Sequence, residues 1–342
     1  MKTITSILFL ILFSSSAINA QPGGFAGAAQ RIGYGPVALS MGNAMTAVTS
    51  EGSYAHYNPA HSALFLNYSQ LDFSVSSLSF DRIHQTAGAF FQLPPSAGLT
   101  FNLTRTGINN IDGRTLSGYP DDNFDVSEYQ ILSAFGIRMS DKLNAGIGFK
   151  INYANYNDKL DAGTSVGIDL GFLYKINNSL NFGFTIQDLF AEYRWNSAEL
   201  YGLQESRNVI NKFPTRFKWG LSYQKEFFTI SGEYEVQALS SEFEEEEIFI
   251  SNGRPSLISS LTELKTNAQQ LRFGGAWKAH ERITIRSGYS IPDLSNSESW
   301  GASGGFSLYL PFDKLSPSIN YAFVMEPNRI SNMHVFSLSL NL

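Results

Sequence analysis

Residues 143–153, LNAGIGFKINY, alternate strictly between apolar side chains and polar or very small ones. Successive side chains of a β-strand point to opposite faces, so this stretch has two contrasting faces. One face carries Leu143, Ala145, Ile147, Phe149, Ile151 and Tyr153. The other face carries Asn144, Gly146, Gly148, Lys150 and Asn152. The stretch is therefore predicted to be a strand with lipid on one side and water on the other.

The same alternation recurs along the chain after residue 66, in about fourteen segments. They cover residues 70–80, 85–93, 98–108, 129–139, 143–153, 166–174, 180–186, 217–223, 228–236, 271–277, 283–289, 306–310, 319–323 and 336–342. In the first of them the alternation slips near Ser76 and Ser77, which predicts a β-bulge. The number and length of the segments are typical of a transmembrane β-barrel.

The connections between these segments are alternately very short and long. The short ones cover residues 94–96, 140–142, 177–179, 224–226, 279–281 and 311–315, and the longer, polar ones cover 109–127, 155–162, 188–213, 238–268 and 292–299. Bacterial outer-membrane barrels have short periplasmic turns and long outer loops. The fold class is therefore predicted to be all-β: a transmembrane antiparallel β-barrel of about 14 strands over residues 67–342, in the outer membrane of a Gram-negative-type bacterium.

Composition agrees with this fold and excludes other classes. Lys2, the apolar residues 7–13 and the mostly small residues 14–20 read as a signal peptide cut before Gln21. The chain has no cysteine, so it can form no disulfide, thiolate metal site or lipid-modified cysteine. Beyond the signal, no apolar run is long enough for a spanning helix. The net charge of -6 argues against nucleic acid as a partner, and no cofactor is indicated.

Residues 21–66 do not follow the strand alternation. They are rich in small residues and interrupted by glycine and proline, so we expect them to fold into the lumen as a small plug. Asn58 is a good helix N-cap and Pro59 is favoured at the first helical position. A short helix that directs the chain into the first strand is therefore predicted here.

Two stretches of this segment resemble the N-terminal pattern of the PorV/PorQ family, which belongs with the FadL-like outer-membrane transporters. They are GPVALSMGNAMTAV at residues 35–48 and SYAHYNPAHSAL at residues 53–64. The positions that match the family pattern are Met41, Gly42, Asn58, Pro59 and Ala60. His61 departs from that pattern, because a glycine often follows Asn-Pro-Ala. The resemblance implies a fourteen-stranded barrel with an N-terminal plug.

Strand alternation places several charged residues on the lumen face. They are Asp72, Arg138, Lys150, Asp169, Lys218, Glu233, Glu235, Arg272 and Arg286. Since both signs are present, we favour mutual ion pairs and plug-anchoring hydrogen bonds over a filter for charged solutes. A cationic cluster beside an apolar pocket could alternatively bind a carboxylate headgroup.

Other motifs point to structure more than to chemistry. The acidic run at residues 242–247 is interpreted as a solvated part of the longest outer loop, with divalent-ion bridging as an alternative. His56 and His61 lack a third ligand at suitable spacing for a metal site. His84 and neighbouring serines do not establish a lipase, so no catalytic residue and no enzyme activity is predicted.

Three functions remain open on the sequence. The resemblance implies a FadL-like carrier that binds a hydrophobic solute in the lumen and passes it when the plug shifts or the wall opens sideways. The glycine-interrupted residues 98–107 are where a distortion of the wall is expected. The resemblance also implies, as an alternative, a component of type IX protein secretion that binds exported cargo or partners through the outer loops at 188–213 and 238–268. A lipid-modifying enzyme is the third.

Overall fold

The computed structural model of the chain describes residues 26–64, 68–115, 117–157, 160–195, 209–251, 254–296, 299–310, 312, 316–326 and 331–342, with the backbone alone for 239–266. The predicted signal peptide, residues 1–20, lies outside this range. No helix in the described part of the chain has the length and apolar character needed to cross a bilayer.

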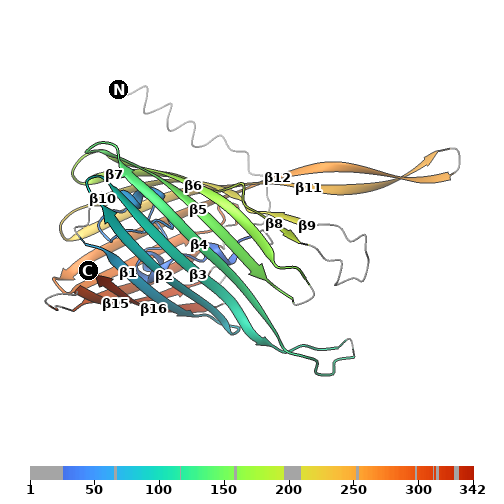
Figure 1. Ribbon diagram of the computed structural model, residues 1–342, viewed down its shortest axis with the longest axis horizontal. Coiled ribbons are helices and arrows are strands. Elements are labelled where there is room, and N and C mark those ends of the chain that lie inside the picture. The colour runs from blue at the N-terminus through green and yellow to red at the C-terminus, as the bar shows by residue number, and fades with distance from the viewer. Residues whose placement is uncertain are drawn as a thin grey trace.

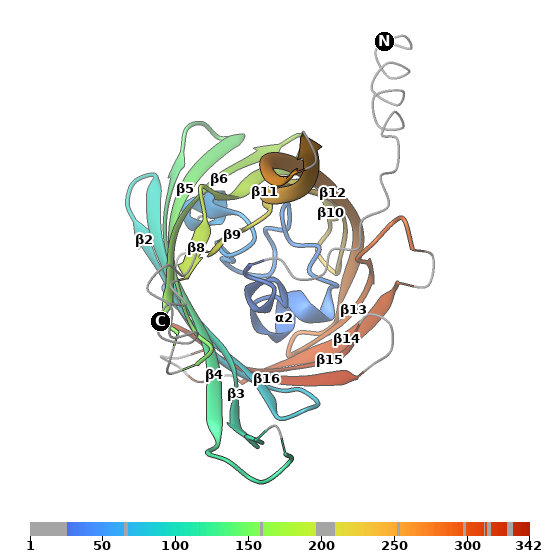
Figure 2. The ribbon, with the colours of Figure 1, turned by 90° about the vertical axis from the view of Figure 1, so that its right-hand side faces the viewer.

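Fourteen strands of the described chain close into one antiparallel barrel (Figures 1 and 2). They are β1 (Gln70–Ser77), β2 (Arg82–Leu93), β3 (Ala97–Ile111), β4 (Phe124–Arg138), β5 (Leu143–Asn155), β6 (Gly163–Lys175), β7 (Leu180–Leu189), β10 (Thr215–Gln224), β11 (Phe228–Ser251), β12 (Arg254–His280), β13 (Ile283–Ile291), β14 (Gly301–Tyr309), β15 (Ser316–Met325) and β16 (Asn332–Asn341). The pairing of β1 with β16 closes the wall, from Gln70↔Asn341 to Ser77↔His334. Closure leaves no sheet edge unpaired in the membrane. The predicted fold class and the number of strands are confirmed.

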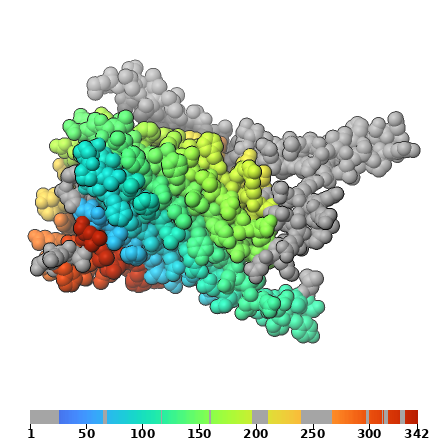
Figure 3. Space-filling model, viewed as in Figure 1, coloured from blue at the N-terminus to red at the C-terminus, as the bar shows by residue number. Residues whose placement is uncertain are grey.

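The wall has two chemically different faces, as the alternation predicts. In β5, Phe149 and Ile151 are 51% and 55% exposed, whereas Lys150 and Asn152 are fully buried. Large apolar side chains are exposed in the same way on the other strands, among them Phe73, Phe101, Leu221, Ile230, Phe273, Trp277, Ile285, Phe306 and Phe336. In the space-filling view of Figure 3, the side chains of β2 to β6 form a continuous outer surface. Such an apolar exterior suits lipid, and the barrel spans an outer membrane.

The remaining described elements lie inside the barrel or at one of its rims. We call residues 26–64 the N-terminal segment; it contains η1 (Ala29–Arg31), α2 (Gly35–Ser40) and η2 (Pro59–Ala63). This segment lies within the ring of strands, drawn in blue in Figure 2. Between β7 and β10, β8 (Glu192–Trp195) pairs with β9 (Val209–Lys212) as a separate two-stranded sheet, within a region expected to be a loop.

The predicted bulge near Ser76 and Ser77 is wrong. β1 pairs without a register break on both sides, through Ser77↔His334 and Ser77↔Ile83. Ser77 takes an outward position that an apolar residue usually holds, and Leu78 is buried against Leu39. The alternation of side-chain polarity is therefore interrupted at Ser77 and Leu78, but the strand itself stays regular.

The expected distortion in residues 98–107 is also not found. β3 pairs continuously with β2, and its register with β4 shifts only between Ile108 and Ile111. The glycines there make room for neighbouring backbone. A Cβ on Gly98 would overlap the carbonyl of Ser62, and a Cβ on Gly107 would lie 2.5 Å from the carbonyl oxygen of Val126.

Residues 238–268 were expected to form an outer loop, and this expectation is wrong for the described residues. β11 and β12 pair without interruption from Phe228↔Trp277 to Ser251↔Arg254, and the hairpin projects well beyond the rim of the barrel (Figure 1). The acidic run 242–247 therefore belongs to β11. In the sequence the two residues between the strands are Asn252 and Gly253, a pair favoured in two-residue hairpin connections.

Candidate functional site

The N-terminal segment follows the inner wall at close range because small residues face each other. A Cβ on Gly136 of β4 would lie 2.5 Å from the backbone nitrogen of Ala63, and a Cβ on Gly274 of β12 would lie 2.5 Å from the carbonyl oxygen of Met41. Gly42 has a φ of 62°, a conformation that favours glycine. The inward glycines of the wall therefore leave room for the backbone of this segment. We call these glycines the glycine track.

Asn58 joins two parts of the N-terminal segment to the wall. Its Oδ1 accepts a hydrogen bond from the backbone N–H of Ala60 at 3.0 Å, which caps η2 where a short helix was predicted. Its Nδ2 donates to the carbonyl oxygen of Thr46 at 2.8 Å and to that of Phe172 in β6 at 3.1 Å. Asn58 is fully buried, so all three bonds are made away from water.

All five residues of the family-like pattern, Met41, Gly42, Asn58, Pro59 and Ala60, lie in this lumenal segment. Their functional role stays a prediction. His61, which departs from the pattern, is fully buried next to them, and burial lowers the pKa of its imidazole to about 4. The side chain is therefore neutral near pH 7.

A first group of lumen charges joins β5, β6, β7 and β10. Lys150 Nζ lies 2.7 Å from Asp169 Oδ2 and 2.8 Å from Asp188 Oδ1. Arg216 Nη2 lies 2.6 Å from the other oxygen of Asp188. Gln187 donates a further hydrogen bond of 3.2 Å to Asp169. With two cations and two carboxylates, all buried, this first charge group is electrically balanced.

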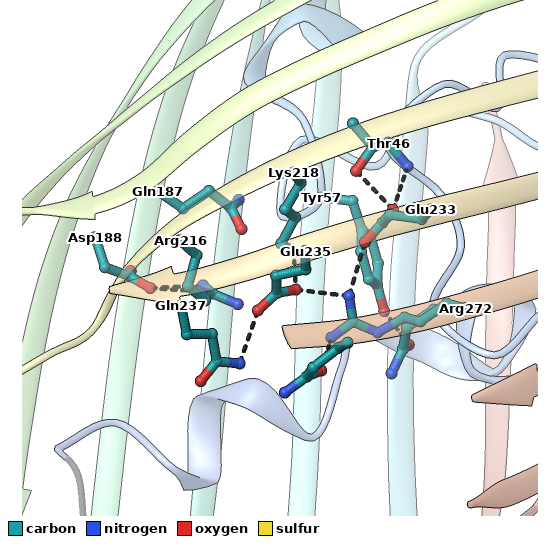
Figure 4. Close-up of polar contacts among 12 residues, drawn as sticks. Thr46, Tyr57, Gln187, Asp188, Arg216, Lys218, Glu233, Glu235, Gln237 and Arg272 are labelled. Atoms are coloured by element: carbon teal, nitrogen blue, oxygen red, sulfur yellow. Dashed lines mark hydrogen bonds and ion pairs between the residues drawn. The ribbon is translucent and has the colours of Figure 1, made fainter. Parts of the chain in front are cut away.

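A second charge group joins β10, β11 and β12 to the N-terminal segment (Figure 4). Arg272 Nη1 lies 2.9 Å from Glu233 Oε1 and 2.6 Å from Glu235 Oε2. Lys218 Nζ lies 3.6 Å from Glu235 Oε2. Glu233 Oε2 also accepts hydrogen bonds from the backbone N–H of Thr46 at 3.0 Å and from its hydroxyl at 2.6 Å. Glu233 thereby anchors the N-terminal segment to the wall.

The last three predicted lumen residues lie elsewhere. Asp72 of β1 accepts a hydrogen bond from the side-chain amide of Gln70 on the same strand. Arg286 of β13 donates to Glu51 Oε2 of the N-terminal segment at 2.9 and 2.6 Å, and to the hydroxyl of Ser307 at 2.6 Å. Arg138 lies at the short-turn end of β4, where it donates to the carbonyl oxygen of Pro95 at 3.3 Å. Arg286 is thus a second anchor, whereas Arg138 is remote from both charge groups.

Three residues that pair with the predicted lumen charges were not predicted: Arg216, Asp188 and Glu51. Arg216 has the same parity as Lys218, so a predicted strand that began one residue earlier, at 216, would have included it. Asp188 lies on the lumen face directly after Gln187, because the register between β6 and β7 shifts there. Strict alternation cannot predict two consecutive inward residues. Glu51 lies in a polar turn with no periodic signal.

The histidine considered for a lipase faces the lumen. His84 Nε2 lies 2.9 Å from the carbonyl oxygen of Gly33, and Nδ1 lies 2.8 Å from the hydroxyl of Thr106. The ring is fully buried, on the side of the wall opposite to the lipid. Its contacts hold the N-terminal segment in place.

A cavity of about 310 Å³ opens at the rim of the long connections, between the N-terminal segment and β12 to β16. Its apolar lining comes from Ile32, Leu39, Val324 and Met333, among others. Four charged residues, Arg31, Arg82, Arg272 and Glu326, also line it. Arg31 donates to the carbonyl oxygen of Ala26 at 2.7 Å. We call this space the mouth cavity. Its size falls within the range of small-molecule sites.

No protein-family model matches the chain, and neither does any curated protein. Solved structures do match. The CymD monoaromatic hydrocarbon channel superposes with a TM-score of 0.59 at 13% identity, covering 91% of this chain and 97% of that one. The Pseudomonas putida toluene transporter TodX gives 0.58 at 13%, covering 90% and 96%. A Pseudomonas aeruginosa FadL homologue gives 0.54 at 12%, covering 90% and 97%. The chain shares their barrel fold.

Proposed function

We propose that this protein is a FadL-like outer-membrane channel that binds hydrophobic small molecules and passes them across the outer membrane. The observation that carries the proposal is the mouth cavity, a space between the N-terminal segment and the wall of a closed barrel, lined by apolar side chains together with the charged residues Arg31, Arg82, Arg272 and Glu326. The fold shared with hydrocarbon channels and a FadL homologue supports it.

The charges of the lumen support a hydrophobic solute over a charged one. The two charge groups contain four cations and four carboxylates, each held in an ion pair: Lys150, Arg216, Lys218 and Arg272 with Asp169, Asp188, Glu233 and Glu235. A charged solute would have to compete with these short, buried pairs. They are better suited to hold the N-terminal segment and the wall together.

We further propose that residues 21–66 act as a plug and that the chain is a PorV/PorQ-like member of this group, with a signal peptide at 1–20 and the barrel at 67–342. The paired elements around Met41-Gly42 and Asn58-Pro59-Ala60 support this assignment. Their backbone lies in the glycine track, where the segment would block a straight path through the lumen.

Binding in the mouth cavity is tested with N-phenyl-1-naphthylamine, an uncharged fluorescent probe, added to the purified protein. Val324→Trp would fill the cavity, and we expect it to abolish saturable binding. Ile319→Trp is the control, since Ile319 faces outward on the same strand. Absence of saturable binding in the unmodified protein would contradict the proposal, as would equal binding by both variants.

The projecting β11–β12 hairpin favours a second candidate function, a component of type IX secretion that binds cargo or partner proteins. The backbone of the hairpin reaches beyond the rim of the barrel (Figure 1). A variant that joins residue 239 to residue 266 would retain the barrel. Loss of co-purifying secreted proteins and a secretion defect in this variant, with probe binding unchanged, would support secretion over transport.

A further inference from the structure

The outward side chains of β1 to β6 change from apolar to polar toward the rim of the long connections. Residues directly opposite each other on neighbouring strands form rows across this part of the wall. One row is wholly apolar and consists of Phe73, Ala87, Leu103, Ile131, Ile151 and Val166. Four residues nearer the rim along each strand, a mainly polar row consists of Ser77, Ile83, Gly107, Ser127 and Asn155. The surface of the lipid therefore lies between these two rows.

A third row, which we call the boundary row, lies between them. It consists of Val75, Gln85, Arg105, Tyr129, Tyr153 and Thr164, each paired with the next. Tyrosine is enriched where a membrane protein crosses the boundary between lipid and water. The long connections of such barrels face outward. The boundary row is therefore at the level of the lipid headgroups of the outer leaflet.

Arg105 is the one charged residue in these three rows, all of which the structure describes. It has the same parity on β3 as Phe101 and Leu103, which are each 45% exposed on the lipid side. Its Nη2 donates to Asn109 Oδ1 at 3.3 Å, and Asn109 lies four residues nearer the rim. The side chain thus extends along the wall toward the headgroups, as long cationic side chains do at membrane boundaries.

The protein supplies Arg105 with neutral partners. Its Nε donates to the hydroxyl of Tyr129 at 3.1 Å, and its Nη1 donates to Gln85 Oε1 at 3.3 Å. No carboxylate in the described part of the chain forms an ion pair with it. Arg114 of the outer β3–β4 connection differs in this respect, since it is paired with Asp112 at 2.5 Å. A charge at membrane level is normally paired, so Arg105 lacks a counter-charge that the protein does not provide.

The free donors of Arg105 indicate the chemistry of the missing anion. A guanidinium has five N–H groups, so the three hydrogen bonds above leave one N–H on each terminal nitrogen. Two parallel donors and a positive charge match two oxygens of a phosphate group. The ring of Tyr129, whose centroid lies 5.9 Å from Arg105 Cζ, helps to hold the fork in place.

The wall below the boundary row suits the rest of a lipid. Leu103, Ile131, Ile151 and Val166 are 45 to 62% exposed there and form an apolar surface for acyl chains. A ligand that covers both rows therefore combines a phosphate at headgroup level with several hydrocarbon chains. Lipid A, the phosphorylated anchor of lipopolysaccharide in the outer leaflet, has this chemistry.

We infer that Arg105, oriented by Tyr129 and Gln85, is a binding site on the outside of the barrel for a phosphate group of lipid A. The site lies on the lipid side of the wall, whereas the mouth cavity lies inside it. The inference therefore stands or falls independently of the proposed passage of small molecules.

Binding is measured by titrating the purified protein in dodecyl maltoside with lipid A that carries two phosphates, and by counting bound lipid with native mass spectrometry. Arg105→Gln removes the charge and keeps a polar side chain. We expect it to lower the apparent affinity at least about fivefold, which corresponds to the roughly 1 kcal/mol that a basic residue contributes near anionic lipid. Arg114→Gln is the matched control, because it removes the same charge from an arginine that is already paired, and it should bind like the unmodified protein.

The titration is repeated with lipid A from which the phosphates have been removed, and with phosphatidylglycerol. The unmodified protein should bind both more weakly than phosphorylated lipid A, and Arg105→Gln should make no further difference to the phosphate-free lipid. Equal affinity of the unmodified protein for lipid A with and without phosphate would overturn the inference, whether or not the variant folds. Equal losses in Arg105→Gln and Arg114→Gln would also overturn it. Phosphatidylglycerol binding as tightly as lipid A would overturn the assignment to lipid A.

Discussion

Replacing Lys150 by methionine tests whether the first charge group stabilises the barrel through charge balance. Methionine has a similar length but no charge, so the variant would retain most of the packing. It would leave two buried carboxylates, Asp169 and Asp188, with Arg216 as their cation. Breaking a buried ion pair by removing one partner costs about 3 to 5 kcal/mol, so Lys150→Met should lower the free energy of unfolding by that amount.

The double variant Lys150→Met/Asp169→Asn removes one cation and one carboxylate and restores the balance. We expect it to be at least about 2 kcal/mol more stable than Lys150→Met, because well-packed neutral replacements of a buried pair are often close to neutral. Stability is measured as urea unfolding in detergent, followed by tryptophan fluorescence and by the gel mobility of unboiled samples. Equal stability of the single and double variants would refute charge balance as the reason.

Two further predictions concern the N-terminal segment. Gly288→Ala places a Cβ on the backbone of Gly42, so we expect a loss of about 1 to 3 kcal/mol in unfolding free energy. Gly304→Ala, whose Cβ would meet its nearest atom at 3.7 Å, should unfold like the unmodified protein, and equal losses would contradict the glycine track. For His61, whose pKa burial lowers to about 4, the unfolded chain takes up a proton below about pH 6.5 while the folded one stays neutral, so stability falls as the pH drops from 6.5 toward 4. Between pH 7.5 and pH 4.5 this histidine should account for roughly 2 to 3 kcal/mol in urea unfolding, and His61→Gln should lose less stability over that interval; an unchanged dependence in the variant would argue against a buried neutral ring.

The barrel could be predicted from the sequence because its rule is local. At each position of a strand, the lipid side favours an apolar side chain and the lumen side favours a polar one, as the adjacent residues Phe149 and Lys150 show. Closure, strand number and the lumen side of Glu233, Glu235 and Arg272 all follow from that alternation.

The assembly of the lumen contacts could not be predicted in the same way. Glu233 and Thr46 are separated by 187 positions in sequence, and no periodic signal relates a coil to a strand. Asp188 was not predicted as a lumen residue because a register shift breaks the alternation at that position. The β11–β12 hairpin was missed for another reason: a run of acidic residues is more typical of a loop than of a strand, whereas here the backbone pairing continues to Ser251↔Arg254.

The position of the N-terminal segment has a consequence for biogenesis. This segment precedes every strand of the barrel, and it contacts both early strands and late ones: η2 packs on β4 and β5, and α2 packs on β14 and β15. The same segment thus contacts strands from both halves of the chain, and the pairing of β1 with β16 encloses it. It can reach this position only before that pairing forms or while it is open.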